Sequence, residues 1–205
     1  MKVKKFRIRP RMPSVGRILK GLLQTKQLDL QVEASLPAES ENFLKQIVPT
    51  AFYQTWSNDD MPIILRPLSD QYGLDKAVAV TLMAATVGAS AEEYLSELLM
   101  NGETTRSQVV SAIAEESVDL SLQFLIRLLT DEANGDDCDV TEAVLLSDPV
   151  VLKELLPLLE AENEGISIDS AQHLSPRFTR VALIAWVPLS RKKKLQQSPL
   201  KKKFA

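Results

Sequence analysis

The stretch KAVAVTLMAATVG (76–88), continued by ASAEEYLSELLMNG (89–102) and ETTRSQVVSAIAEESVDLSLQFLIRLL (103–129), decides the fold. No charged residue occurs from Ala77 to Gly88, so this segment is too apolar to face water on any side. Its short length, its β-branched residues and the glycine at its end favour a buried strand over 78–87 rather than a helix.

Two helices are expected directly after this strand. Ser90 is the predicted N-cap of a helix over 91–100. Thr105 and Gln108 have the spacing of a capping box, and the helix that they open is expected to extend to about Thr130. Apolar residues recur along it at helical spacing, which indicates one buried face.

Regular elements are also expected on both sides of this block. Before it, the patterns predict a strand over 2–10, a helix over 15–26 capped by Ser14, a strand over 28–36, a helix over 38–56 and an edge strand over 61–68. After it, they predict an acidic loop over 131–140, a helix over 149–162 capped by Asp148, and strands over 166–169 and 179–189. Together these elements indicate an α+β protein.

Composition bounds the class of protein. The chain has 205 residues, 45% hydrophobic and 25% charged, as in a globular protein with one domain, which we place over 1–189. Its single cysteine, Cys138, excludes an internal disulfide and fits a reducing compartment. No uncharged apolar run reaches the length of a membrane span, and no apolar signal segment follows the basic N-terminus, so a cytoplasmic location is expected.

Charge is strongly segregated along the chain, although the net charge is only −3. Residues 1–20 carry eight Lys or Arg and residues 170–205 carry nine, and neither segment has an acid. All 27 acids lie from Asp29 to Asp169 beside only seven basic residues, which gives this part a net charge of −20. The basic ends either are solvated or meet an anionic partner, and 190–205 is expected to be a disordered tail.

Motifs for common cofactors and catalytic sites are absent. Neither GxGxxG nor GxxxxGK[ST] occurs, and one His with one Cys cannot form a zinc site. His173 has no GxSxG nucleophile to serve and is more typical of a polar surface residue. The acids of 131–137 lack the spacing of a calcium loop. We therefore assign no catalytic residue and no metal ligand, and expect an accessory or binding domain rather than an independent enzyme.

Two clusters allow more than one interpretation. Phe52, Tyr53 and Trp56 either line a pocket or, as is more usual for such clusters, belong to the core. Glu115 and Glu116 fall in the middle of a helix that is otherwise rich in apolar residues. Either both face solvent, or one points inward, where loss of water would raise its pKa.

Three segments resemble a known family. AVAVTLMAATVGASAEEYLSELL (77–99) with SQVVSAIAEESVDLSLQFL (107–125) is similar to the activation domain of cobalamin-dependent methionine synthases and its stand-alone relatives, where an apolar strand ending like "aaTlG" precedes two helices. LLPLLEAENEGISIDSAQHLSPRFTRVALIAWVPL (155–189) resembles the family's "LLdaek.igvsLTES.mm.P.kSvsaiiG", with Ile168, Pro176, Val181 and Ile184 in register. ENFLKQIVPTAFYQTW (41–56) resembles its entry to the first sheet strand. The resemblance covers about 38–189, in the same order.

The resemblance implies a twisted antiparallel sheet with helices packed around it. In the methionine synthase, this domain binds S-adenosylmethionine and presents it to the cobalamin domain during reductive remethylation of inactive cobalt. For this chain it implies an accessory protein of corrinoid-dependent methyl transfer, with S-adenosylmethionine as its cofactor. Cobalamin would come only through a partner, a corrinoid-binding protein.

The ligand is expected near 131–150 and 168–176. Candidate contacts are Asp169, Ser170, His173 and Arg177. Where the family has R-x-S-P-G-Y, this chain reads EANGDDCDVTEAVLLSDP (132–149), and the family's LTES is replaced here by Ile168-Asp169-Ser170-Ala171.

A second hypothesis keeps the fold as a scaffold without a small ligand. It would engage an acidic protein or nucleic acid through its basic ends, namely Lys4, Lys5, Arg7, Arg9, Arg11 and Lys192–Lys194. Phosphate binding of that kind depends steeply on salt. Two features argue against nucleic acid. The body of the chain is acidic, and Phe6 is the one aromatic residue interleaved with these bases.

Overall fold

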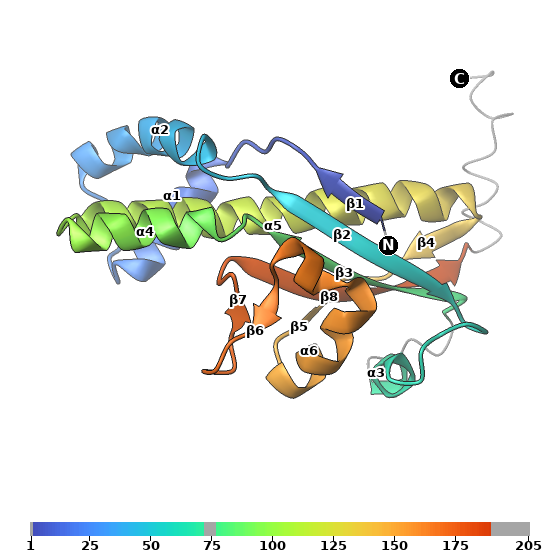
Figure 1. Cartoon of the computed structure of the whole chain (residues 1–205). Coiled ribbons are helices and arrows are strands. Elements are labelled where there is room, and N and C mark those ends of the chain that lie inside the picture. Colours follow the sequence, from blue (N-terminus) through green and yellow to red (C-terminus); the bar gives the residue numbers. More distant parts are fainter. Residues whose placement is uncertain (1, 72–76, 190–205) are drawn as a thin grey trace, which may run out of the picture.

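An antiparallel sheet forms the central layer of the molecule, and helices cover both of its faces (Figure 1). The computed structural model describes residues 2–71 and 77–189. The sheet contains β1 (Lys2–Lys5), β2 (Thr50–Ser57), β3 (Ala79–Thr86), β4 (Cys138–Val140), β5 (Val144–Leu146) and β8 (Thr179–Pro188). Its order is β1-β2-β3-β8-β4, with β5 paired to the N-terminal part of β8. A separate hairpin pairs β6 (Ser167–Ile168) with β7 (Leu174–Ser175). The predicted α+β class with an antiparallel sheet is confirmed.

The helices form a layer on each face of the sheet. They are α1 (Met12–Leu22), α2 (Leu30–Leu44), α3 (Leu65–Gln71), α4 (Ser90–Met100), α5 (Thr104–Gly135) and α6 (Pro149–Leu155), with the 3-10 helices η1 (Leu156–Leu159) and η2 (Ala161–Glu164) after α6. One apolar core joins the sheet to α1, α2, α4 and α5, and a second joins it to α3, α6 and η1. Among the described residues, no helix combines the length and apolarity needed to cross a membrane.

β3 is buried along almost its whole length and separates the two cores. Met83 and Ala85 face the core that contains α5, whereas Leu82 and Ala84 face the core that contains α6, and all four are 0% exposed. Both edges of β3 are also satisfied, because it pairs with β2 on one side and β8 on the other. This confirms the strand predicted over 78–87.

α5 is long enough to span the sheet. Its 32 residues correspond to about 48 Å at 1.5 Å per residue. The helix continues past its predicted end because Ala133 is also buried against the core. The predicted loop over 131–140 is therefore wrong: its first half is helix, and 138–140 form β4, which pairs with the end of β8.

The predicted strand over 28–36 is wrong, because this stretch begins α2. The Asp29 carboxylate accepts a hydrogen bond from the backbone N–H of Gln31 at 2.7 Å and thereby caps the helix. Leu36 and Phe43, two turns apart, are buried, while Leu30 is 82% exposed. Apolar alternation over 28–32 matched a strand, but the longer helical spacing decides the structure.

The predicted helix over 38–56 is wrong beyond Leu44. β2 occupies its second half, and Phe52 and Tyr53 lie in opposite cores although they are adjacent in sequence. Consecutive residues can be buried on opposite sides only in a strand of period two. Both aromatics are buried in the core, and Tyr53 also borders a cavity, while Trp56 is partly buried.

The edge strand predicted over 61–68 is also wrong. Pro62 and Pro67 cannot donate to a β ladder. Instead, the N–H of Leu65 bonds to the carbonyl of Pro62 at 2.9 Å in a turn that leads into α3. Leu65 and Leu68 then bury their side chains in the second core.

Helix ends agree with the predictions only in part. The Asp148 carboxylate accepts the N–H of Val150 at 2.8 Å, as expected for an N-cap. The rest of the helix predicted over 149–162 is completed by the tighter turns of η1 and η2. Ser90 is the first residue of α4 rather than its cap, and the predicted capping box is absent because α5 already begins at Thr104.

The N-terminal segment is less regular than predicted. β1 covers 2–5 instead of 2–10, and α1 covers 12–22 instead of 15–26, so Ser14 lies inside the helix. Between them, the ring of Phe6 lies 4.5 Å from the ring of Phe124 on α5. The segment therefore packs along α5 before α1 begins.

Arg106 ties three helices together. Its Nε lies 2.9 Å from both carboxylate oxygens of Glu39 on α2, and its Nη2 donates to the hydroxyl of Tyr94 on α4. Glu103 accepts a further hydrogen bond. Hydrogen bonds to Glu103 and Glu39 raise the pKa of Arg106 further above its ordinary value, so it stays charged.

Of the two adjacent carboxylates of α5, Glu116 is the one that points inward. Its side chain is 4% exposed, and Arg11 donates to it at 2.7 Å from the loop before α1. Glu115 keeps 26% of its side-chain surface exposed. An ion pair thus fixes the entry of α1 onto α5.

Replacing Arg11 by alanine should destabilise the protein, because the buried Glu116 carboxylate loses its charged partner. We expect a loss of about 1–3 kcal/mol in the free energy of unfolding, measured by urea denaturation. Arg9→Ala is the matched control, since Arg9 is exposed and in no ion pair with the described residues. Equal losses in the two variants would show that the pair does not stabilise the fold.

Candidate functional site

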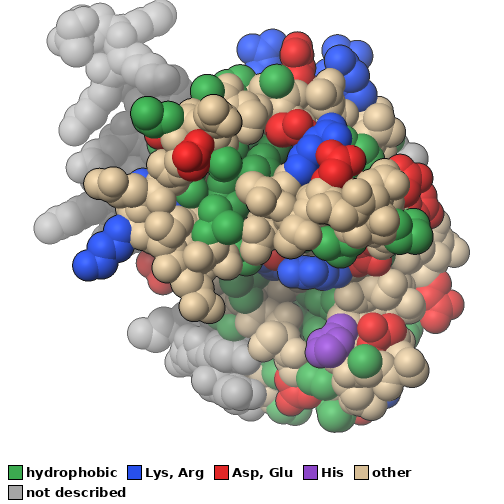
Figure 2. Space-filling view, turned by 90° about the vertical axis from the view of Figure 1, so that its left-hand side faces the viewer, with side chains coloured by type: hydrophobic (Ala, Val, Ile, Leu, Met, Phe, Trp, Pro, Cys, Tyr) green, Lys and Arg blue, Asp and Glu red, His purple; other side chains and the backbone are tan. Residues whose placement is uncertain are grey.

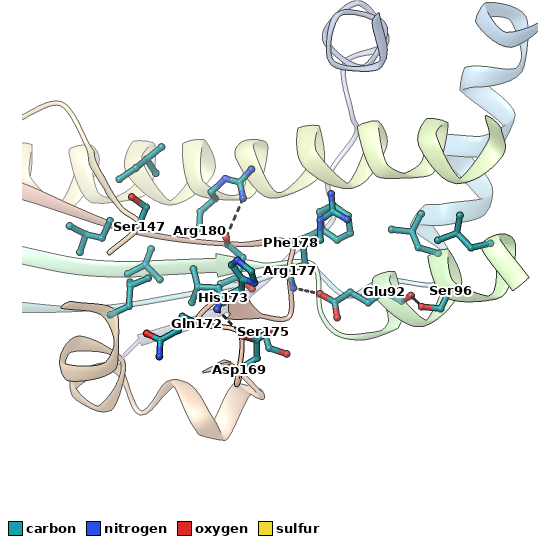
Figure 3. Close-up of a pocket in the computed structure, with 18 residues that line it drawn as sticks. Glu92, Ser96, Ser147, Asp169, Gln172, His173, Ser175, Arg177, Phe178 and Arg180 are labelled. Atoms are coloured by element: carbon teal, nitrogen blue, oxygen red, sulfur yellow. Dashed lines mark hydrogen bonds between the residues drawn. The ribbon is translucent and has the colours of Figure 1, made fainter. Parts of the chain in front are cut away.

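A cavity opens where β8 begins, between the helical layer and the β6–β7 hairpin (Figures 2 and 3). Its volume is about 840 Å³. In the space-filling view the surface is hollowed here, with basic and histidine side chains at the rim and apolar ones deeper (Figure 2). The size falls in the range of small-molecule sites, roughly 300–1,000 Å³.

Leucines form an apolar wall of the cavity. α4 presents Leu95 and Leu99 on one face, and β5 presents Leu145. Leu99 is 56% and Leu145 is 57% exposed, whereas Phe178 is fully buried. The apolar lining is therefore buried at the bottom of the cavity, at Phe178, and exposed at its rim, at Leu99 and Leu145.

β5 is held in place by its neighbour β8. Thr141, which lies between β4 and β5, donates its N–H to the carbonyl of Ala185 at 2.9 Å, and its hydroxyl accepts the N–H of Ala185 at 3.0 Å. The segment after it brings Leu145, Leu146 and Ser147 into the cavity. The two stretches expected near a ligand, 131–150 and 168–176, thus meet here.

The β6–β7 hairpin carries three of the four sequence-predicted residues, Asp169, Ser170 and His173. Asp169 donates its N–H to the carbonyl of His173 at 2.9 Å, and its carboxylate accepts the N–H of His173 at 2.8 Å. Asp169 closes the turn in this way, and both side chains line the cavity. Ser170 is exposed in the same turn and does not line it.

Arg177 supplies a cation at the cavity (Figure 3). Its backbone N–H donates to the Glu92 carboxylate on α4, and its guanidinium carbon lies 5.3 Å from the centroid of the Phe178 ring. The guanidinium is exposed and forms no ion pair with the described residues. The structure therefore brings Asp169, His173 and Arg177, but not Ser170, to one cavity.

Arg180 also lines the cavity, but its charge is engaged by α5. Its guanidinium contacts the Glu115 carboxylate and lies 3.4 Å from an Asp119 oxygen. Burial raises the pKa of Asp119, Arg180 opposes this shift, and the nearby charges of Glu115 and Glu116 add to it. Arg180 therefore links β8 to α5 rather than presenting a free charge to a ligand.

Sequence reasoning missed the contribution of α4. Glu92, in the first turn of α4, lines the cavity together with Leu95, Ser96 and Leu99. These four residues share one helical face by their spacing. The signal for this contribution was the stripe of mixed polar and apolar residues on one face of the helix that directly follows a buried strand.

A second cavity, of about 930 Å³, lies near the C-terminal end of β2. Its lining includes Tyr53, Glu132, Asp136 and Trp186. The Tyr53 hydroxyl donates to Glu132 at 2.7 Å. Its described lining residues include acids but no cation, so it does not suit a ligand with a carboxylate. Within the described ranges, no group of three or more His, Cys, Asp or Glu is placed to hold a metal ion.

Comparison with known proteins identifies the fold. No protein-family model matches the sequence, and no curated protein matches it significantly. Among solved structures, the chain is similar to the MetH reactivation domain in a crystal structure bound to AdoHcy, with a TM-score of 0.58 and 11% sequence identity. The match covers 93% of this chain and 80% of the other. At this identity the likeness establishes a shared fold.

The raised pKa of Asp119 predicts a pH dependence of stability. Because its folded pKa lies above the unfolded value, Asp119 stabilises the fold fully below about pH 4, and this contribution is lost as pH rises through the folded pKa. Asp119→Asn should therefore gain stability relative to wild type as pH rises from about 4 to 7. Urea denaturation across this range measures the difference.

The control is Gln123→Ala, an uncharged change one turn further along α5. It should displace the stability curve equally at every pH. Parallel curves for Asp119→Asn and wild type would contradict the prediction.

Proposed function

We propose that this chain is a cytoplasmic accessory protein of corrinoid-dependent methyl transfer that binds S-adenosylmethionine in the cavity at the start of β8. The fold supports this through its likeness to a reactivation domain crystallised with AdoHcy. The observation that carries the proposal is that Asp169, His173 and Arg177, selected from sequence, line a single cavity of suitable size.

The lining residues fit the chemistry of this ligand. S-adenosylmethionine carries a carboxylate, two positive charges and an adenine nucleoside. Arg177 offers a guanidinium for the carboxylate, because planar N–H pairs match carboxylate oxygens. Glu92 and Asp169 offer carboxylates for the cationic groups, and the leucines of α4 and β5 offer a surface for the purine.

The accessory role assigns the methyl chemistry to a partner. When bound, S-adenosylmethionine would supply a methyl group, and the residues of this chain would hold it and exclude water from one side. Cobalamin would arrive on a corrinoid-binding protein. Leu99, Met100 and Leu145, which are 56%, 79% and 57% exposed, provide apolar area at and beside the cavity for such a partner to cover.

A second candidate function is a scaffold that binds an anionic partner through its basic N-terminus. Arg7 and Arg9 favour it, because both are exposed and in no ion pair with the described residues. The side chains of Lys4 and Lys5, Lys192–Lys194 and the tail over 190–205 lie outside what the structure describes. Partner capture that weakens steeply with added salt would support this alternative.

Calorimetric titration of the full chain with S-adenosylmethionine, with and without cobalamin, tests the first proposal. We expect saturable binding in the micromolar range, and a loss of affinity of about tenfold in Arg177→Ala, because the carboxylate loses a charged hydrogen-bond donor. Arg127→Ala is the control, since Arg127 is an exposed arginine of α5 that does not line the cavity.

Absence of heat would count against the proposal when combined with absence of thermal stabilisation. At a hundredfold excess over a micromolar dissociation constant, linkage predicts a gain of about 2.7 kcal/mol. A protein that shows neither signal lacks a site of that affinity.

A further inference from the structure

The charged groups that line the cavity differ in how far their neighbours neutralise them. Arg180 is paired with Glu115 and Asp119 on α5. Asp169 directs a carboxylate oxygen to the backbone of its own hairpin. Glu92 forms no ion pair with the described residues, and the N–H of Arg177 that it accepts carries no net charge. Asp169 is likewise in no ion pair with the described residues, but it is exposed, whereas Glu92 is half-buried. Of the two carboxylates that line the cavity, Glu92 is therefore the one that places an unpaired negative charge in its wall.

The surroundings of Glu92 keep this charge in place and effective. Glu92 lies in the first turn of α4, where the positive end of the helix dipole stabilises an ionised carboxylate. Its side chain is half-buried beside Leu95 and Leu99 on the same helical face. Because apolar neighbours lower the local dielectric, the carboxylate acts on a ligand charge more strongly than it would in open water.

A negative charge at this place has a specific consequence for the ligand. S-adenosylmethionine and S-adenosylhomocysteine differ at one atom: the first has a methylated, positively charged sulfur, and the second a neutral thioether. The extra methyl group adds little contact area, so a site separates the two mainly by electrostatics.

We propose that Glu92 makes the cavity selective for S-adenosylmethionine over S-adenosylhomocysteine. This inference rests on the proposed function, since it concerns the same cavity and ligand. The Glu92 carboxylate would attract the sulfonium, and that attraction disappears when the methyl group leaves. Loss of the positive charge on the sulfur would thus favour release of the demethylated product.

Calorimetry of the full chain with each of the two ligands tests the proposal. Wild type should bind S-adenosylmethionine about tenfold more tightly than S-adenosylhomocysteine, the ratio that one partly buried charge pair supplies. In Glu92→Gln this ratio should fall to about one, through weaker binding of S-adenosylmethionine alone. The amide oxygen of Gln can still accept the N–H of Arg177, so the loop position is retained.

The matched control is Glu93→Gln, which removes the neighbouring carboxylate of α4 that is exposed and does not line the cavity. It should leave both affinities unchanged. Equal weakening of both ligands in Glu92→Gln would overturn the proposal and assign Glu92 to loop positioning. A Glu92→Gln variant in which neither affinity changed would also overturn the proposal, while the proposed function still stood. If wild type bound neither ligand, the proposed function itself would fail.

Discussion

Burial of β3 on both faces is the constraint on which the rest of the structure depends. A strand with apolar side chains on both sides needs a cover above and below, and its two edges need partners. α5 and the N-terminal helices cover one face, α6 and the 3-10 turns cover the other, and β2 and β8 satisfy the edges. The cavity lies where these two layers separate, beyond the end of β3 and at the start of β8.

Strong local signals predicted the fold best. The uncharged run before Gly88 identified β3, and the apolar run within 179–189 identified β8, because a short, almost wholly apolar segment must be buried on both faces. The predictions were wrong for segments whose apolar residues fit both the period of a strand and that of a helix. Residues 28–36 alternate like a strand, yet they belong to a helix whose buried residues, Leu36 and Phe43, lie two turns apart.

Sequence alone could indicate which residues share the candidate site only where a single stretch of chain carries them. The resemblance over 155–189 indicated Asp169, His173 and Arg177, which stay close because a short hairpin joins them. Ser170 belongs to the same turn but lies away from the cavity. Glu92 and Leu145 come from α4 and β5, and their arrival at the same place depends on the tertiary arrangement of helix and sheet. No local pattern contains that information.

The pairing of β3 with β8 also sets conditions for how the chain is made. Ala79 pairs with Trp186 and Thr86 with Thr179, so one edge of the central strand finds its partner only when β8 has been synthesised. Until then, a long apolar strand presents unpaired backbone groups, which is the state most prone to aggregate. Contacts this distant in sequence also make folding slow. β3, which stabilises the folded protein, is thus also the segment most exposed to aggregation during synthesis.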